Sequence, residues 1–368
     1  MAEYLLETEG VVKQERARKR VTETDEELRK ILEARQAEIK VVGVGGAGGN
    51  TISRLMQVGI VGAETVAINT DAQDLLYTDA DNKILIGKDI SAGLGAGANP
   101  SVGMEAAKES KEELKRALEG ADMIFINCGL GGGTGTGASP VVADIAKKVG
   151  ALTVSIVTLP FTMEGKQRFR NAQEGLENLE SVVDTLIVIP NDKLLQIVPD
   201  VSITTAFKVA DEILVNAVKG IAELITKPGL VNLDFADVRA VMSSGGLAMI
   251  GMGESDTENR ALESVEKALN NPLLDIDIDG ATGALVNVCG GPDVTIKECQ
   301  SIVENVSSKI NQDAKIIWGA QIIKELGDVI RSMLIITGVK SSQIYGPEKT
   351  YTFEKQKEIE RVLGVDFI

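Results

Sequence analysis

Short apolar runs alternate with glycine-rich loops and helical segments over the first half of the chain, and this alternation constrains the fold more than any other feature. The predicted strands span 39–44, 65–69, 83–86, 122–127, 152–158 and 185–189. Strands that alternate with helices form βαβ units and a parallel sheet. Ligands of such sheets collect at the carboxyl ends of the strands. This half therefore predicts an α/β domain with a binding site at one edge of its sheet.

A long helix should follow, because apolar residues keep helical spacing from about residue 203 until Lys227, Pro228 and Gly229 supply a stop. At 368 residues the chain has room for two domains with separate cores. Further strands are expected near 246–253, 282–289, 315–323 and 330–338, with helices near 257–270 and 295–309. The predicted division is an N-terminal helical extension (1–38), a first domain (39–202), a central helix between the domains (203–228), a second α/β domain (229–340) and a tail (341–368).

Composition narrows the classes of function. The chain has no histidine, which removes histidine general bases, Ser-His-Asp triads and histidine-ligated metals. The formal charge of −16 opposes binding to nucleic acid. No apolar run approaches the roughly 20 residues that span a bilayer, so we expect a cytoplasmic protein without membrane insertion. Cys128, Cys289 and Cys299 are too few and too scattered for a disulfide framework or a zinc site.

Three glycine-rich segments follow predicted strands and indicate bound phosphate. They are GVGGAGGN at 43–50, SAGLGAGANP at 91–100 and GLGGGTGTGASP at 129–140. Glycines let backbone N–H groups approach an anion closely, and the helix after the third segment points its positive end at the same place. One dinucleotide pyrophosphate needs one such loop, so three loops favour a nucleoside triphosphate.

Other interpretations of these segments remain open. Gly43, Gly45 and Gly48 have the G-x-G-x-x-G spacing of a dinucleotide fold, with Asp71 placed to hold a ribose, which would make the chain a dinucleotide-dependent oxidoreductase. Each segment alone could also be a simple turn. The glycine segments lack the G-x-x-x-x-G-K-[ST] pattern. Charge compensation must therefore come from backbone dipoles and a cation, such as Mg²⁺ held mainly by phosphates and water.

Eight segments together resemble one family. They are GGAGGN, AINTDAQ, GLGAGANP, GLGGGTGTGASPVVA, TLPFTMEGKQR, IPNDKLL, ITKPGLVNLDFADVRAVM and DIDGATGALVNV. In this order they look like the signatures of FtsZ, the tubulin-like GTPase of prokaryotic cell division, and the chain is similar to the archaeal type. The resemblance covers residues 39–338. It implies a tubulin-like fold, in which a Rossmann-like parallel-sheet GTPase domain is joined by the central helix to the second α/β domain.

The resemblance also implies a GTP/GDP site built from most of these segments. The residues implied at the phosphates and the ribose are Gly45, Gly46, Ala47, Gly48, Asn50, Asn69, Thr70, Asp71, Ala72, Ala96, Gly97, Asn99, Gly131, Gly132, Gly133, Thr134, Gly135, Thr136, Gly137, Pro160, Glu164 and Arg168. Asn191, Phe207 and Asp211 are implied at the guanine. Phe207 can stack on a base, and Asp211 can accept hydrogen bonds from the N1 and N2 donors of guanine. The structural alternatives are a core phenylalanine and a solvated carboxylate.

Asn232, Asp234 and Asp237 in the segment GLVNLDFADVR are the candidate catalytic residues. The structural alternative is that Asp234 caps the following helix, with Asp237 in its first turn. Nothing in the long helix lets this segment bend back to the phosphates of its own domain. The resemblance implies that the segment meets the γ-phosphate held by a neighbouring subunit, so that hydrolysis depends on head-to-tail assembly into an open filament.

The remaining expectations concern partners and location. The resemblance implies that the protein assembles with itself into a division ring at mid-cell. The terminal peptide RVLGVDFI is apolar at the end of a charged tail, and FtsZ relatives use such peptides to reach a membrane tether. A frayed or self-docked terminus is the alternative. A tubulin relative that shapes cells without dividing them is the nearer rival to the division role.

Overall fold

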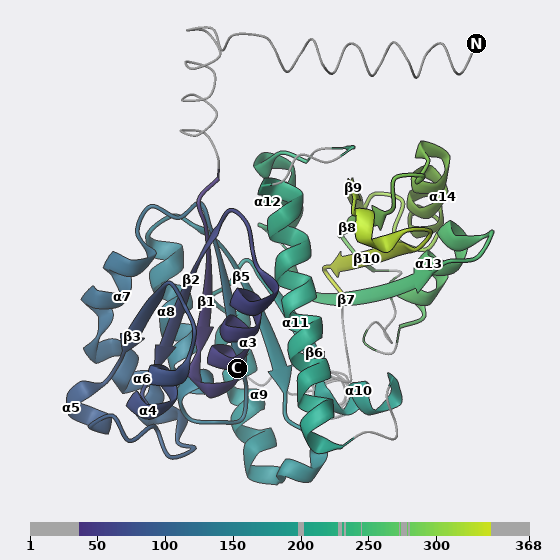
Figure 1. Ribbon diagram of the computed structural model, residues 1–368. Coiled ribbons are helices and arrows are strands. Elements are labelled where there is room, and N and C mark those ends of the chain that lie inside the picture. Colours follow the sequence, from purple (N-terminus) through teal and green to yellow (C-terminus); the bar gives the residue numbers. More distant parts are fainter. Residues whose placement is uncertain are drawn as a thin grey trace, which may run out of the picture. The chain divides into compact units, whose positions relative to one another are not determined.

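The computed structural model describes residues 37–197, 202–226, 230–231, 233–243, 245–271, 273, 278 and 280–339 (Figure 1). The chain divides into two units, Met1–Ala37 and Glu38–Ile368, and every helix and strand named below belongs to the second. The predicted N-terminal helical extension (1–38) lies outside the described residues, except for Ala37 and Glu38 just before the first strand. The tail 341–368 also lies outside them.

Strands and helices alternate along the described chain. The strands are β1 (Ile39–Val44), β2 (Ala63–Asn69), β3 (Asn82–Leu85), β4 (Met123–Gly129), β5 (Leu152–Leu159), β6 (Thr185–Pro190), β7 (Gly246–Ser255), β8 (Gly283–Gly290), β9 (Lys315–Ile322) and β10 (Ile330–Thr337). The α-helices are α3 (Gly45–Val58), α4 (Ala72–Tyr77), α5 (Lys88–Ser91), α6 (Pro100–Glu109), α7 (Lys111–Leu118), α8 (Thr134–Lys148), α9 (Lys166–Glu180), α10 (Asn191–Ile197), α11 (Ile203–Thr226), α12 (Phe235–Met242), α13 (Arg260–Leu269) and α14 (Ile296–Ser307). Short 3₁₀ helices occupy Thr162–Glu164 and Lys324–Leu326.

All ten strands of the described chain pair in one sheet, in the order β3-β2-β1-β4-β5-β6-β7-β10-β8-β9. The pairs from β3 to β7 are parallel, whereas β10 runs antiparallel to both β7 and β8. The ladder between β6 and β7 has three residue pairs, Thr185 with Gly246, Leu186 with Leu247 and Ile187 with Ala248. This short ladder joins the first half of the molecule to the second.

The strands of the first half are buried on both faces, as expected for a parallel sheet covered by helices. Side chains of β1 alternate between two apolar clusters, with Val42 and Val44 in one and Ile39 and Val41 in the other. The first cluster also contains residues of α7, α8 and α9, and the second contains residues of α3 and α11. Helices therefore cover both faces, and the carboxyl ends of the parallel strands meet at one edge.

Helix α11 packs against both halves of the molecule. Its 24 residues are about 36 Å long at 1.5 Å per residue. Val218 and Ile221 are fully buried in a cluster that contains Phe125 of β4 and Ile335 of β10. The sequence-based expectation of a central helix between two α/β regions is confirmed. Both apolar clusters cross the β6–β7 ladder, so apolar packing continues from one region to the other.

The predicted strands are all present, with ends that differ by one or two residues. The two helices expected in the second half are also present, as α13 and α14. One expectation is wrong: residues 45–50 are not a loop but the first turns of α3. Gly45 has φ = 74°, which lets the chain turn from the strand into the helix without an intervening loop.

Gly43→Ala should destabilise the protein, because a Cβ at this position would lie 2.3 Å from the carbonyl oxygen of Gly48. Backbone cannot yield as a flexible side chain does, so we expect a loss of about 1–3 kcal/mol in the free energy of unfolding. Calorimetry of the ligand-free protein measures this loss. Gly280→Ala is the matched control, since a Cβ there meets no atom within 4 Å. Equal stability of the two variants would contradict the packing argument.

Candidate functional site

A cavity of about 290 Å³ lies where the parallel strands end. It is bounded by the carboxyl ends of β1, β4 and β5 and by the first turns of α3, α8, α10 and α11. The residues that line it are Val44, Gly45, Gly46, Ala47, Asn50, Gly129, Leu130, Gly132, Gly133, Thr134, Gly135, Thr158, Pro160, Glu164, Arg168, Asn191, Phe207, Ala210, Asp211 and Leu214. A cavity therefore lies where the sequence analysis predicted a binding site, at the carboxyl ends of the parallel strands.

Two helix N-termini meet at the cavity. Gly45 begins α3 and Thr134 begins α8, and no side chain caps either helix at its N-cap residue. A Cβ on Gly45 would lie 2.9 Å from the backbone nitrogen of Gly135, so the two glycine segments touch through their backbones. Uncapped N–H groups and the positive ends of two helix dipoles favour an anion at this point.

Three charged residues line the cavity, namely Glu164, Arg168 and Asp211. Glu164 accepts a hydrogen bond from the Phe161 backbone N–H at 2.8 Å and pairs with Arg168 at 2.6 Å. The neighbouring Thr162 donates through its backbone N–H to Asp192 at 3.0 Å. These bonds fix the turn Thr162–Glu164 beside the cavity, where Glu164 can still accept a hydrogen bond from a ligand hydroxyl.

The opposite end of the cavity combines a ring with two polar groups. Phe207 is 42% exposed and packs edge-on against Phe161, with ring centroids 5.3 Å apart. Asn191 is 5% exposed, and its Oδ1 has no hydrogen-bond partner among the described residues. Burial raises the pKa of Asp211 from its ordinary 3.8 to about 6, and the nearby Glu212 adds to this rise. A partly exposed ring beside a buried amide oxygen and a carboxyl group suits a planar heterocycle.

Several predicted residues do not line this cavity but support it. Asp71 caps α4 by accepting hydrogen bonds from Gln73 and Asp74 backbone N–H groups at 2.9 and 3.1 Å, and Asn69 donates to the Asp74 carboxylate at 2.7 Å. The side chains of Asn69 and Asp71 therefore hold the start of α4 in place and support the cavity from outside its lining. The predicted residues outside the lining are Gly48, Asn69, Thr70, Asp71, Ala72, Ala96, Gly97, Asn99, Gly131, Thr136 and Gly137.

Three glycines act through close packing. A Cβ on Gly48 would lie 2.5 Å from the carbonyl oxygen of Asn127, which holds α3 against the sheet. A Cβ on Gly137 would lie 1.9 Å from the carbonyl oxygen of Pro100, and one on Gly103 would lie 2.4 Å from that of Gly133. Helices α6 and α8 therefore touch through their backbones. Gly103 is a supporting residue that the sequence analysis missed.

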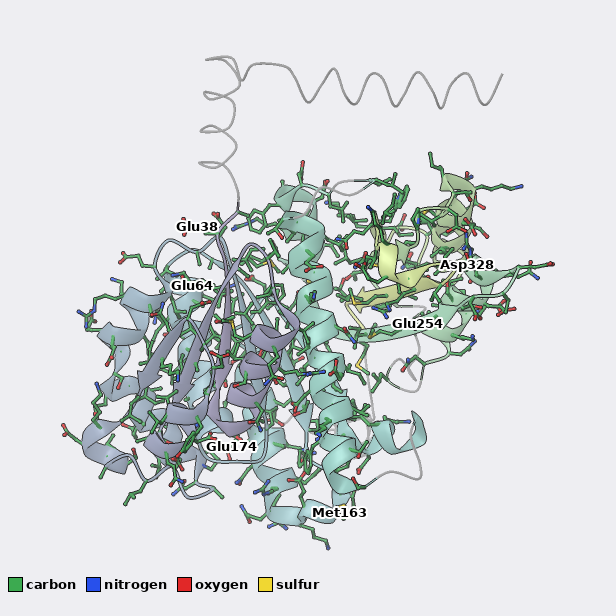
Figure 2. All side chains as sticks on the ribbon, in the orientation of Figure 1. Glu38, Glu64, Met163, Glu174, Glu254 and Asp328 are labelled. Carbon is green, nitrogen blue, oxygen red and sulfur yellow. The ribbon has the colours of Figure 1, made fainter. Side chains whose placement is uncertain are left out.

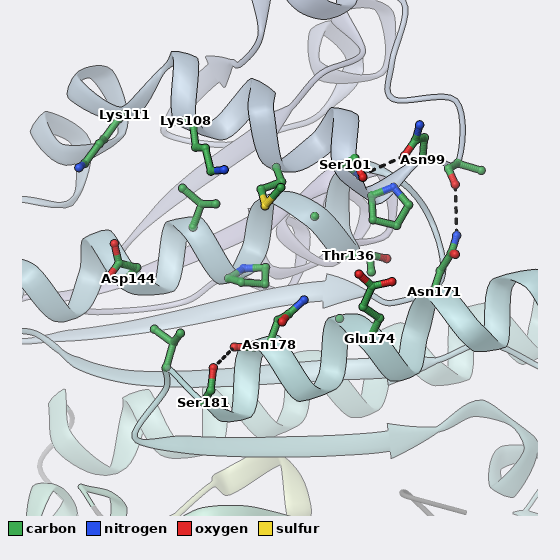
Figure 3. A pocket seen from close by; sticks show the side chains of 18 of the residues that line it. Asn99, Ser101, Lys108, Lys111, Thr136, Asp144, Asn171, Glu174, Asn178 and Ser181 are labelled. Carbon is green, nitrogen blue, oxygen red and sulfur yellow. Dashed lines mark hydrogen bonds between the residues drawn. The ribbon is translucent and has the colours of Figure 1, made fainter.

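A second cavity, of about 800 Å³, lies on the other side of the third glycine segment, between α6, α8 and α9 (Figure 3). Asn99, Thr136 and Gly137 line it rather than the first cavity. Asn171 of α9 is buried at its edge and donates to the carbonyl oxygens of Ala98 at 3.2 Å and Gly131 at 3.4 Å. Asn171 thus ties the second glycine segment to the third, and the sequence analysis missed it.

The candidate catalytic residues Asp234 and Asp237 lie at the opposite end of the sheet. Asp234 caps α12 and accepts a hydrogen bond from the Asp237 backbone N–H at 2.9 Å, as its structural alternative predicted. Arg239 of the same helix donates to the carbonyl oxygen of Asp122, just before β4, at 3.3 Å. Gly129, at the other end of β4, lines the cavity. Six residue steps along a strand span about 20 Å, so α12 lies far from the cavity of its own chain.

Figures 1 and 2 show the same separation of the two ends. Helix α12 lies at the end of the sheet where Glu38 and Glu64 mark the beginnings of β1 and β2, and α10 and Met163 lie at the other end. Asn232 lies outside the described residues.

The sequence analysis also missed part of the lining, namely Val44, Gly129, Leu130, Thr158, Ala210 and Leu214. The strand ends Val44 and Thr158 could have been found, because they close predicted strands.

Comparison with known sequences identifies the family. The GTPase-domain sequence model of the Tubulin/FtsZ family matches residues 38–199, and the model of the FtsZ family's C-terminal domain matches residues 246–340. Cell division protein FtsZ 1 of Thermococcus kodakarensis is 62% identical over 337 residues, which cover 92% of this chain and 90% of that protein. The chain belongs to the FtsZ family. FtsZ 1 of Methanocaldococcus jannaschii is 61% identical over 336 residues, or 91% of each chain.

A solved FtsZ structure agrees with the fold described above. The empty FtsZ dimer of M. jannaschii has a TM-score of 0.84 and 61% identity, and the match covers 88% of this chain and 96% of that one. The predicted tubulin-like α/β fold with a GTPase domain and a C-terminal domain is confirmed. The interpretation as a dinucleotide-dependent oxidoreductase is wrong, since the matched domain is a GTPase domain.

Membership of the FtsZ family establishes the class of activity. The protein is a cell-division GTPase of the tubulin family and binds guanine nucleotides. Self-association into filaments and a division ring is the behaviour of this family. None of the described helices is both long enough and apolar enough to cross a membrane.

Asp211→Asn should change how stability depends on pH. Because the folded protein holds the Asp211 proton up to about pH 6 and the unfolded chain releases it near pH 3.8, this group makes wild-type stability fall as pH rises from about 4 to 6. The variant has no carboxyl to ionise, so its advantage over wild type should grow across that window to about 1–2 kcal/mol at pH 7.

Chemical denaturation of the ligand-free protein at pH 4.5, 5.5 and 7 measures this difference. Asp256→Asn is the control, because Asp256 is an exposed carboxylate away from the cavity. A stability difference between Asp211→Asn and wild type that stays constant with pH would contradict the raised pKa.

Proposed function

We propose that the first cavity holds GTP and that hydrolysis is completed by the next subunit of a head-to-tail filament. In this arrangement Gly45, Gly46 and Gly132–Gly135 surround the phosphates, Glu164 and Arg168 bind the ribose, and Asn191, Phe207 and Asp211 bind the guanine. One observation carries the proposal: the cavity and the candidate catalytic carboxylates Asp234 and Asp237 lie at opposite ends of one sheet. The N-termini of α3 and α8 lie at one end, and Asp237 lies at the other.

Guanine recognition follows from the groups at the base end. Asp211 in its charged form accepts from the N1 and N2 donors of guanine, which adenine does not present in this pattern. The unpartnered Oδ1 of Asn191 is a further acceptor, and the exposed face of Phe207 stacks on the ring. Burial removes water from the Asp211 carboxylate and raises its pKa, and the positively polarised N–H edge of guanine would stabilise the charged form in place of that water.

The phosphate end suits Mg²⁺ that is bound mainly by its ligand. Glu164 is already paired with Arg168, and Asp211 lies at the base end, so the lining offers no carboxylate pair near the helix N-termini. Mg²⁺ characteristically keeps several waters and binds phosphate oxygens, so this donor set fits it. When bound, the ion neutralises charge on the phosphoryl group that is transferred.

The chain's own residues supply the other elements of catalysis. Uncapped N–H groups of α3 and α8 stabilise charge on the phosphate oxygens. In a head-to-tail contact Asp234 and Asp237 of one subunit reach the γ-phosphate of its neighbour, where the carboxylates orient and polarise the attacking water, and Asn232 shares this role. Asp234 also caps α12, so it holds the Asp237 backbone in place. Capping and catalysis are therefore compatible roles for Asp234.

A mixing experiment tests whether the site is shared. Asp237→Ala keeps the cavity but lacks the water-polarising carboxylate, and the double variant Asn191→Ala/Asp211→Ala keeps that carboxylate but lacks the base contacts. Each alone should hydrolyse little GTP. In an equimolar mixture about a quarter of random interfaces join an intact cavity to an intact Asp237, so turnover should recover to about a quarter of the wild-type rate.

Phosphate release measures the rate, and co-sedimentation checks that both variants enter the same filaments. The same mixture diluted below the concentration at which filaments form is the control, and it should be inactive. A mixture that only averages the two separate rates, although both variants co-sediment, would show that each chain contains its whole active site.

We further propose that the filaments form the division ring in the cytoplasm and reach the membrane through a tether protein bound to the terminal peptide 361–368. The support is the apolar end of an otherwise charged tail. Deletion of 360–368 should leave GTP turnover unchanged and abolish recruitment to vesicles that carry the tether. Recruitment that survives the deletion would contradict this role, and a deletion that slows turnover would place the peptide in the assembly itself.

A further inference from the structure

Two threonine hydroxyls form a buried pair behind the proposed phosphate site. The Oγ1 atoms of Thr70, which follows β2, and Thr134, the first residue of α8, lie 2.7 Å apart. Thr70 is fully buried, whereas Thr134 is 9% exposed and lines the cavity. The pair therefore connects the interior of the protein to the point where the phosphates are proposed to bind.

Each hydroxyl carries one hydrogen, and only one of these two hydrogens forms the bond between the oxygens. Among the described residues, neither hydroxyl has another hydrogen-bond partner. The rest of Thr70 is fixed: its N–H donates to Asn69 Oδ1 at 2.8 Å, and its carbonyl oxygen accepts from the Ser91 hydroxyl at 3.1 Å and from the Gly95 N–H at 3.2 Å. These bonds fix the backbone from which the Thr70 side chain extends to Thr134.

Burial decides which hydroxyl donates. If Thr134 donated to Thr70, the Thr70 hydrogen would be left in the interior without an acceptor, and an unsatisfied buried donor costs free energy. If Thr70 donates to Thr134, the remaining hydrogen belongs to Thr134, which faces the cavity and can meet water or a ligand. The second arrangement satisfies every buried group of the pair.

We propose that Thr70 is a positioning residue: it donates its hydroxyl hydrogen to Thr134 and thereby directs the Thr134 hydrogen into the cavity, towards a phosphate oxygen. This inference rests on the proposed function of the cavity. A hydroxyl that accepts one hydrogen bond becomes a better donor of the next, so Thr134 donates more strongly to an anion. In this proposal Thr70 stands behind the nucleotide and acts on it through Thr134.

A double-mutant cycle measured on GDP binding tests the proposal. Thr70→Val removes the donor while keeping the side-chain shape, and it should weaken GDP binding by about 5-fold, the loss expected for one hydrogen bond. In a Thr134→Val background the same substitution should have no further effect, because the group that it orients is already missing. Thr70→Ser keeps the hydroxyl and should bind GDP as wild type does.

Thermal unfolding without nucleotide tests independently whether buried Thr70 depends on Thr134 for its hydrogen bond. Thr134→Val leaves the Thr70 hydroxyl buried without a partner, so it should lower the melting temperature more than Thr70→Val does, and the double variant should recover part of that loss. Equal melting temperatures of the two single variants would contradict the buried pair on which the proposal depends.

The outcomes separate this inference from the proposed function. If Thr134→Val weakens GDP binding but Thr70→Val leaves it unchanged or tightens it, the positioning role is overturned and the cavity remains the nucleotide site. Additive losses in the cycle also overturn it, since they indicate that Thr70 acts only on the fold. If neither Thr134→Val nor Asp211→Ala weakens GDP binding, the cavity is not the site, and both proposals fail together.

Discussion

The close approach of α3 to the sheet is the contact on which the rest of the site depends. Gly43 and Gly48 let the first turns of this helix pack directly against β1 and β4, with no side chain between them. That contact brings the positive end of α3 to the carboxyl ends of the strands, opposite the start of α8. A methyl group at either position would move the helix outward and separate the two glycine segments.

A parallel sheet has two unlike ends, and this protein uses both. The cavity occupies the carboxyl end, and α12 with Asp234 and Asp237 occupies the amino end, as the bond from Arg239 to Asp122 fixes. Residues at opposite ends of a strand cannot meet within one chain. They can meet when identical chains stack end to end, because the amino end of one molecule then faces the carboxyl end of another. The proposed dependence of hydrolysis on assembly follows from this polarity.

Local patterns predicted the fold well, because a buried strand needs a continuous apolar run, and glycines mark where the chain must turn. The glycine segments that these patterns identified form part of the cavity lining, and the resemblance to the FtsZ family supplied the other predicted residues of the lining. They did not predict the supporting residues Asn171 and Gly103, whose partners lie far away in the sequence. Nor did they separate residues that face the cavity from those behind it, as with Thr134 and Thr70, since only the packed structure determines burial. The continuous sheet was missed for the same reason.

The backbone contacts of Gly103 and Gly137 have a consequence for ligand binding. Because α6 and α8 touch without intervening side chains, the second and third glycine segments cannot shift independently, and Asn171 joins them again through two carbonyl groups. Little chain entropy remains to be lost when a ligand arrives, since the cradle is already ordered. A looser cradle would lose part of its free energy of binding in ordering its loops. In this cradle, that free energy remains available to favour the contact between one molecule and the next.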